Sequence, residues 1–262
     1  MGLNETSFLA SLTVVIASPL TWIMVGVALI SGLTRGFSGF GGALIFVPIA
    51  GAILGPRIAV PMFFVMDLFT ASPWALRKLP ECDLKAMAPI FIGTLLFLPL
   101  GALALGAFDP LILRWGTAIP VAAMLGFLVT GWRYPGTPSI PVSVGVGGTA
   151  GFLYGSTGIP GPIIIAYWLA SPVAASVIRT NIMVYYASSS LFTNLVFWLK
   201  GLLSWYIVAN VLVFAPTYAL GLAGGSWFFK RTSERSYRNL ALLMIAISTL
   251  ISLPIFDGYF RK

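Results

Sequence analysis

The sequence predicts an all-α polytopic membrane protein made of two inverted-topology repeats, each with a glycine-broken short helix or re-entrant hairpin and about three full spans. Two observations support this fold class. The chain of 262 residues is 58% hydrophobic and only 8% charged, whereas a soluble domain carries roughly a quarter charged residues. In addition, one glycine pattern occurs twice, at residues 32–42 and 151–161.

The two glycine stretches read GLTRGFSGFGG and GFLYGSTGIPG and share the pattern G-x3-G-x-[S/T]-G-x2-G. Corresponding glycines are 119 residues apart, and Ser38 corresponds to Thr157. Chance coincidence is the alternative in a chain with 28 glycines, but the hydropathy of the flanking sequence repeats as well. A fixed internal offset indicates a repeated structural unit.

The first half begins with an apolar run at residues 8–33. Because a helix needs about 20 residues to cross the hydrocarbon core, this run predicts one tilted span with an extra turn at its start. The glycine stretch interrupts it, and the next run, at 41–54, is too short for a full span. It therefore predicts a half-helix or a re-entrant hairpin. Three full-length candidates follow, at residues 58–76, 86–107 and 111–131.

The second half repeats this order after a polar, proline-rich linker at residues 133–141. A run at 142–154 leads into the second glycine stretch, and a short run at 159–170 follows it. Full-length candidates then occupy residues 177–199, 205–229 and 239–256. We therefore predict a first membrane repeat at 1–132 and a second at 142–262, joined by the linker at 133–141.

The charged connections predict how the repeats lie in the membrane. Each half has an odd number of crossings, so the second half starts on the opposite side from the first. An inverted repeat then places Arg133 and the basic connections at 77–85 and 230–238 on one face. The positive-inside rule makes that face cytoplasmic and puts both termini outside.

Several function classes are disfavoured by composition. The chain has no histidine and a single cysteine, which excludes a Ser-His catalytic pair, an intramolecular disulfide and a thiolate metal cluster. We expect no metal and no cofactor. The net charge of +8 is better explained by topology signals than by nucleic-acid binding. A membrane enzyme is a poor alternative, because no apolar segment carries paired carboxylates. The N-terminus lacks a basic signal region, so we expect the first apolar run to remain in the membrane.

The glycine breaks predict a site for a small anion. Ser38 and Thr157 are residue types that cap helix N-termini, and Pro160 suits a first helical turn. The short helices would then point unpaired N–H groups and positive dipole ends at the breaks. Close helix packing is the alternative explanation for the glycines. The predicted binding residues in the breaks are Gly36, Ser38, Gly39, Gly41, Gly42, Gly155, Ser156, Thr157, Gly158 and Gly161.

Polar residues inside predicted spans are commonly functional, because lipid disfavours them. Asp67 could carry a coupling proton or cation, or it could pair with Arg35 or Arg179. Arg179 could bind a sulfonate with two N–H groups, or it could be a cytoplasmic anchor at the interface; with Asn181 it completes the predicted binding residues.

Two further groups of side chains near the breaks have two explanations each. Helix–helix hydrogen bonding and a permeation path explain the polar helix face equally well. Its members are Asn181, Ser188, Ser189, Ser190, Thr193 and Asn194. Tyr154, Tyr185 and Tyr186 could line the cavity, although packing is the simpler explanation for each.

The sequence around both breaks resembles a known family. Residues 39–48, GFGGALIFVP, resemble the first signature of the TauE/SafE family of sulfite and organosulfur anion exporters. Residues 158–165, GIPGPIII, resemble the second, as does RTN at 179–181. The likeness extends over residues 24–253. It departs at Ala43, where family members often have a third consecutive glycine.

This resemblance implies a transporter of sulfite, thiosulfate, sulfoacetate or other short sulfonates in the cell (inner or plasma) membrane. The expected partners are this anion, the lipid bilayer and a coupling proton or cation, with no nucleic acid. A small-anion channel without ion coupling is the alternative.

Overall fold

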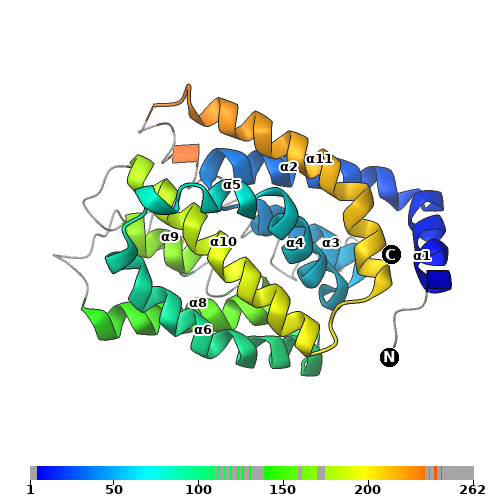
Figure 1. The fold of residues 1–262 in the computed structure, drawn as a ribbon, viewed down its shortest axis with the longest axis horizontal. Helices are drawn as coiled ribbons and strands as arrows, with labels where there is room; N and C mark the ends of the chain where they lie inside the picture. The colour runs from blue at the N-terminus through cyan, green and yellow to red at the C-terminus, as the bar shows by residue number, and fades with distance from the viewer. Residues whose placement is uncertain are drawn as a thin grey trace.

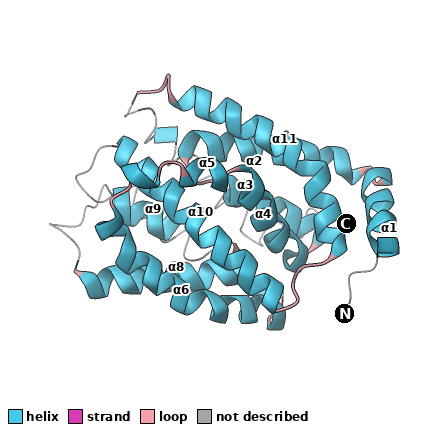
Figure 2. Ribbon diagram, viewed as in Figure 1, coloured by secondary structure: helices cyan, strands magenta, loops and turns pink. Residues whose placement is uncertain are grey.

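The computed structural model describes residues 5–109, 139–158, 161–169 and 175–233, together with isolated positions between 111 and 130 and between 236 and 243. Secondary structure in these residues is helical, without a strand (Figure 2). Four of the described helices are long and apolar enough to cross a membrane: Leu20–Ser38, Leu84–Ala107, Ser176–Leu199 and Trp205–Phe229. The predicted all-α polytopic fold is therefore confirmed. Most of the predicted spans at 111–131 and 239–256, and most of the linker, lie outside the described residues.

The first half contains seven described helical elements before residue 109. They are α1 (Glu5–Ala17), α2 (Leu20–Ser38), α3 (Gly42–Leu54), α4 (Pro56–Thr70), α5 (Ser72–Leu76), the 3-10 helix η1 (Leu79–Glu81) and α6 (Leu84–Ala107). The single span predicted at residues 8–33 is wrong. The chain divides at Ser18 and Pro19, because proline lacks an N–H and disfavours a helical residue before it. The candidate at 58–76 likewise divides at Ala71.

The second half repeats the order of a long helix, a break, a short helix and further long helices. Its described elements are α8 (Ile140–Thr157), α9 (Gly161–Leu169), α10 (Ala175–Leu199) and α11 (Trp205–Phe229). The short helices predicted after each glycine stretch are confirmed, since α3 has 13 residues and α9 has 9. A helix that crosses the hydrocarbon core needs about 20.

Two helix pairs form opposite sides of the molecule. Helix α2 lies along α11 and α6 lies along α8, while α3, α4, α5, α9 and α10 lie between the pairs (Figure 1). Each pair joins the first long helix of one half to a later long helix of the other half. The halves are therefore interlocked, and neither buries its apolar faces alone.

Glycines allow these paired helices to approach closely. A Cβ built on Gly36 would lie 2.1 Å from the carbonyl oxygen of Leu222 in α11, and one built on Gly155 would lie 2.3 Å from that of Leu98 in α6. Gly32 and Gly151 make equivalent contacts in the same pairs. Small residues at such positions let two backbones pack without a side chain between them. Close packing thus accounts for the glycines in the helical part of each motif.

Contacts at the breaks repeat between the halves in the same way. Gly39 lies against Arg179 and Met183 of α10, while Gly158 lies against Val60 and Phe64 of α4. Val60 and Phe64 precede Arg179 and Met183 by the same 119 residues that separate the two glycines. Such an exchange of contacts is expected of repeats related by a two-fold axis. The inverted orientation of the repeats in the membrane stays a prediction.

Candidate functional site

The two breaks interrupt their helices at corresponding residues. Helix α2 ends at Ser38, and α3 begins after Gly39 (φ +82°), Phe40 and Gly41 (φ +70°). Helix α8 ends at Thr157, and Gly158 follows it with φ +72°. L-residues with side chains rarely adopt positive φ, so glycine is required where each helix stops. The offset of 119 residues seen in the sequence therefore also separates two helix ends that have the same left-handed glycine.

The predicted N-cap role of Ser38 and Thr157 is wrong. Both are the last residues of the preceding helices, where the Ser38 hydroxyl donates to Thr34 O at 2.7 Å and the Thr157 hydroxyl to Leu153 O at 2.8 Å. The N-cap of α3 is Gly41, which offers no side-chain acceptor. Serine and threonine satisfy their hydroxyls on the carbonyl four residues back when they lie inside a helix.

A small cavity of about 20 Å³ lies between the two breaks. This is room for about one water molecule. The lining residues come from both halves: Arg35, Phe40, Gly41, Gly42, Ala43, Leu44, Phe63, Phe64, Asp67, Tyr154, Gly158 and Tyr186. Four predicted site residues, Gly41, Gly42, Asp67 and Gly158, are therefore brought together. The second break continues through Ile159 and Pro160, which lie outside the described residues.

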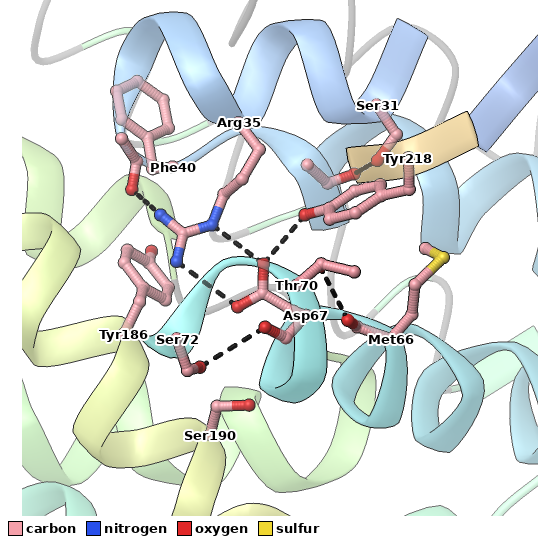
Figure 3. A network of polar contacts seen from close by, with 12 residues as sticks. Ser31, Arg35, Phe40, Met66, Asp67, Thr70, Ser72, Tyr186, Ser190 and Tyr218 are labelled. Carbon is pink, nitrogen blue, oxygen red and sulfur yellow. Dashed lines mark hydrogen bonds and ion pairs between the residues drawn. The ribbon is translucent and has the colours of Figure 1, made fainter. Parts of the chain in front are cut away.

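A buried ion pair forms one wall of this cavity. Arg35 Nε lies 3.0 Å from Asp67 Oδ1, and Arg35 Nη2 lies 3.3 Å from Asp67 Oδ2. The Tyr218 hydroxyl donates to Asp67 Oδ1 at 2.8 Å, and Arg35 Nη1 donates to the Gly39 carbonyl. Figure 3 shows these side chains converging from α2, α4 and α11. Of the two alternatives for Asp67, pairing with Arg35 is present, and a role in ion coupling stays a prediction.

Arg179 holds the end of α2 from the opposite half of the chain. Its Nη2 donates to Gly36 O at 2.6 Å and its Nε to Phe37 O at 3.1 Å, while the guanidinium carbon lies 3.9 Å from the centre of the Phe229 ring. The last carbonyls of a helix have no partner within it and carry partial negative charge. The side chain is buried, so it is not a surface anchor. Sulfonate binding by Arg179 stays a prediction, with two of its nitrogens already bonded to carbonyls.

Other predicted binding residues lie in helix contacts instead of the cavity lining. Gly36 and Gly155 are at the close helix crossings described above, and the Ser156 hydroxyl donates to Phe152 O. Asn181 Oδ1 accepts the backbone N–H of Asp83 at 3.0 Å, beside the start of α6. Gly39 contributes its carbonyl to Arg35 and packs on α10, and Gly161 is the first residue of α9.

The polar face of α10 makes hydrogen bonds to neighbouring helices. Asn194 Nδ2 donates to Phe64 O of α4 at 3.0 Å, and the Ser190 hydroxyl donates to the same oxygen at 3.4 Å. These contacts favour the helix–helix alternative for this face.

Aromatic side chains complete the cavity in a way that sequence reasoning only partly anticipated. Tyr154 and Tyr186 line it, while Tyr185 hydrogen-bonds to Thr94 at 2.7 Å and is not among the lining residues.

Arg35 was expected only as a partner for Asp67, yet it lines the cavity itself. An arginine inside an apolar span is the signal that indicates such a role, because a charge in that environment is seldom kept without one.

A multi-pass helical protein whose two halves each bring a broken helix to one cavity with a buried ion pair has the architecture of a secondary membrane transporter. The family described as Sulfite exporter TauE/SafE matches residues 24–251 of this chain. The chain therefore belongs to the TauE/SafE family, which consists of membrane transporters that export sulfite and related organosulfur anions. Comparisons with curated proteins and with solved structures found no significant match.

Proposed function

We propose that the protein is a secondary transporter of small sulfur-containing anions, namely sulfite, thiosulfate, sulfoacetate or other short sulfonates, in the inner or plasma membrane. The anion binds near mid-membrane between the two breaks. One observation carries this proposal: a single cavity is lined by the start of α3, by Gly158 of the second break and by the guanidinium of Arg35. Family membership supports the class of substrate.

Electrostatics explains why an anion would bind there. Removing an anion from water is expensive unless hydrogen-bond donors and positive charge replace its hydration shell. The start of α3 supplies the positive end of a helix dipole and the N–H groups of its first turn beyond Gly42, whose own N–H donates to Phe40 O at 2.7 Å. Gly41 and Gly42 have no side chain to hold a ligand away from these groups. Helix α9 begins at Gly161, beside the other break, and contributes a second N-terminus in this proposal.

A transport assay in proteoliposomes tests the proposed function. Purified protein is reconstituted, and the flux of radiolabelled sulfite, thiosulfate and sulfoacetate is compared with that of chloride and with flux into protein-free liposomes. We expect saturable uptake of at least one sulfur anion, accelerated by unlabelled substrate on the other side. Saturable flux without acceleration from the opposite side would indicate a channel instead of a carrier. Equal flux with and without protein for every sulfur anion would contradict the proposal.

Asp67 is the proposed site of ion coupling. Its carboxylate is buried at the cavity against Arg35, where taking up a proton or losing a cation would change the charge that the anion meets. Asp67→Asn should abolish accumulation driven by an ion gradient and leave part of the sulfite exchange. The measurement compares both rates across a range of pH, with thermal unfolding as a check on the fold. Uptake with an unaltered pH dependence would return Asp67 to a structural role.

A further inference from the structure

The guanidinium of Arg35 has donors to spare at the cavity. Arginine carries five N–H hydrogens in a planar fork. Three are used, by the two oxygens of Asp67 and by the Gly39 carbonyl. These three bonds leave one hydrogen on each terminal nitrogen for a further acceptor. Arg35 can therefore keep Asp67 on one edge while it donates to a second oxyanion.

Tyr186 brings an unused hydroxyl to the same cavity from α10. The residue is 92% buried, since 8% of its surface is exposed, and its hydroxyl has no hydrogen-bond partner among the described residues. The Arg35 guanidinium lies 5.4 Å from the centre of the Tyr186 ring, and Figure 3 shows the two side chains next to each other. A buried hydroxyl without a partner is destabilising, and such groups are rare unless a ligand or water satisfies them.

The internal repeat shows where the two halves differ at this cavity. With the offset of 119 residues, Arg35 corresponds to Tyr154 and Asp67 corresponds to Tyr186. The ion pair of the first half is therefore replaced by two tyrosines in the second, where the Tyr154 hydroxyl donates to the Tyr186 carbonyl at 3.2 Å. All four side chains line the cavity. The cavity thus has a charged side and a neutral hydrogen-bonding side.

We infer that Arg35 and Tyr186 are the side-chain ligands of the transported oxyanion, one from each half, and that Asp67 is a positioning residue that holds the other edge of Arg35. This inference rests on the proposed function. The guanidinium fork matches two oxygens of a sulfite or sulfonate group, and the Tyr186 hydroxyl donates to another. Chloride has no pair of oxygens for the fork, so the arrangement selects oxyanions.

The cavity must widen before such an anion can enter. It has room for about one water molecule, and a sulfite ion is larger. Phe40 and Phe63 are among the bulky side chains that line the cavity. Arg35 and Tyr186 come from different helices, so an anion bound by both would connect the halves and stabilise one arrangement of them.

Equilibrium binding of radiolabelled sulfite to the purified protein tests the inference. Tyr186→Phe removes an oxygen that has no hydrogen-bond partner among the described residues, so we expect an unchanged or slightly raised Tm. The Kd should rise about tenfold, the usual effect of losing one hydrogen bond to a charged group. Arg35→Lys keeps the charge but loses the fork. It should raise the sulfite Kd by at least as much and reduce the preference for sulfite over chloride.

The matched control is Tyr185→Phe, on the adjacent residue of α10. It removes the hydrogen bond to Thr94 outside the cavity lining, so it should lower thermal stability slightly and leave the sulfite Kd unchanged. If Tyr186→Phe binds sulfite as tightly as the unchanged protein, the inference is wrong and the proposed function stands. If the unchanged protein binds and transports no sulfur anion, the proposed function fails and the inference fails with it. Tyr186→Phe keeps the test decisive even where Arg35→Lys does not fold.

Discussion

Arg35 and Asp67 place two opposite charges in the interior of a protein that is only 8% charged. Their mutual attraction does little more than offset the loss of hydration, so the pair is weak evidence for stability. Removing one partner is different, because the other charge then stays buried without compensation, which costs about 3–5 kcal/mol. The pair lies at the cavity between the breaks, where the proposed function gives it a role in anion binding and ion coupling.

The glycines that end α2 and α8 provide the first prediction. Gly39→Val and Gly158→Val should each remove most sulfite transport, because both residues have positive φ and a Cβ would lie about 3 Å from side chains of the opposite half. Transport in proteoliposomes is the measurement. Gly201→Val is the control, since Gly201 also has positive φ but no atom within 4 Å of its Cβ position. Thr157→Ala should have a smaller effect, because its hydroxyl bonds within α8.

Equal transport losses for Gly201→Val and the two break variants would contradict this prediction, since backbone strain alone would then explain all three. Normal transport by the break variants would contradict it as well. Insertion into the membrane is checked for every variant by its yield after solubilisation.

Individual site residues could be predicted from the sequence where the glycine pattern specified a backbone conformation, and at Asp67, where a charge interrupts an apolar span. Gly41, Gly42 and Gly158 do lie at the cavity. Gly36 and Gly155 belong to the same pattern but lie in helix crossings, because the pattern combines a packing surface with a turn and the two are indistinguishable in sequence. The convergence of Arg35 and Tyr218 on Asp67, with Tyr186 beside Arg35, depends on tertiary packing, which no local pattern specifies.

At the scale of helices, the pairs α2–α11 and α6–α8 depend on glycine contacts. Gly36→Leu and Gly155→Leu should destabilise the protein strongly, since a Cβ at either site would lie within 2.3 Å of a backbone oxygen of the partner helix. Overpacking typically costs about 1–3 kcal/mol, and here the backbones themselves must separate. Thermal unfolding of purified protein measures the effect, which we expect as a fall in Tm of several degrees or as aggregation.

Gly26→Leu and Gly145→Leu are matched controls for these substitutions. They lie on the same two helices, correspond to each other by the offset of 119 residues, and have no atom within 4 Å of their Cβ positions. Both should leave the Tm nearly unchanged. The packing account is contradicted if the controls lower the Tm as much as Gly36→Leu and Gly155→Leu.

Helix order and the short helices after each break could be predicted because apolar length and glycine spacing determine them. The exact residues at which helices begin and end were harder to predict from the sequence. The division at Pro19 was missed because hydropathy averages over it, although a proline inside an apolar run is a local signal for a break. Ser38 was expected to start α3, yet serine is favourable both as an N-cap and as a last-turn residue bonded to the carbonyl four residues back.

At the scale of the whole molecule, the orientation in the membrane can be tested with Cys82, the only cysteine of the chain. Cys82 lies in the basic connection between η1 and α6, which the positive-inside rule places in the cytoplasm. A membrane-impermeant maleimide should therefore label Cys82 in inside-out vesicles and leave it unlabelled in intact cells. Labelling of intact cells would reverse the predicted orientation. Cys82→Ser is the control for background labelling.

The pH dependence of this labelling follows from the surroundings of Cys82. Partial burial, with the nearby Asp83 carboxylate, raises the pKa of the thiol to about 11. Because only the thiolate reacts, labelling should be slow at neutral pH and should accelerate about tenfold for each pH unit up to that pKa. A rate that levels off near pH 9 would show an ordinary, solvent-exposed thiol.

The central claim is that one anion binds between the two breaks, at a cavity to which both halves contribute. The most direct test is a crystal structure with bound selenite, the heavier analogue of sulfite, located from the anomalous scattering of selenium. We predict one strong peak between the Arg35 guanidinium, the start of α3 at Gly42 and Gly158. A peak confined to the basic connection around Lys230 and Arg231, with none between the breaks, would contradict the account.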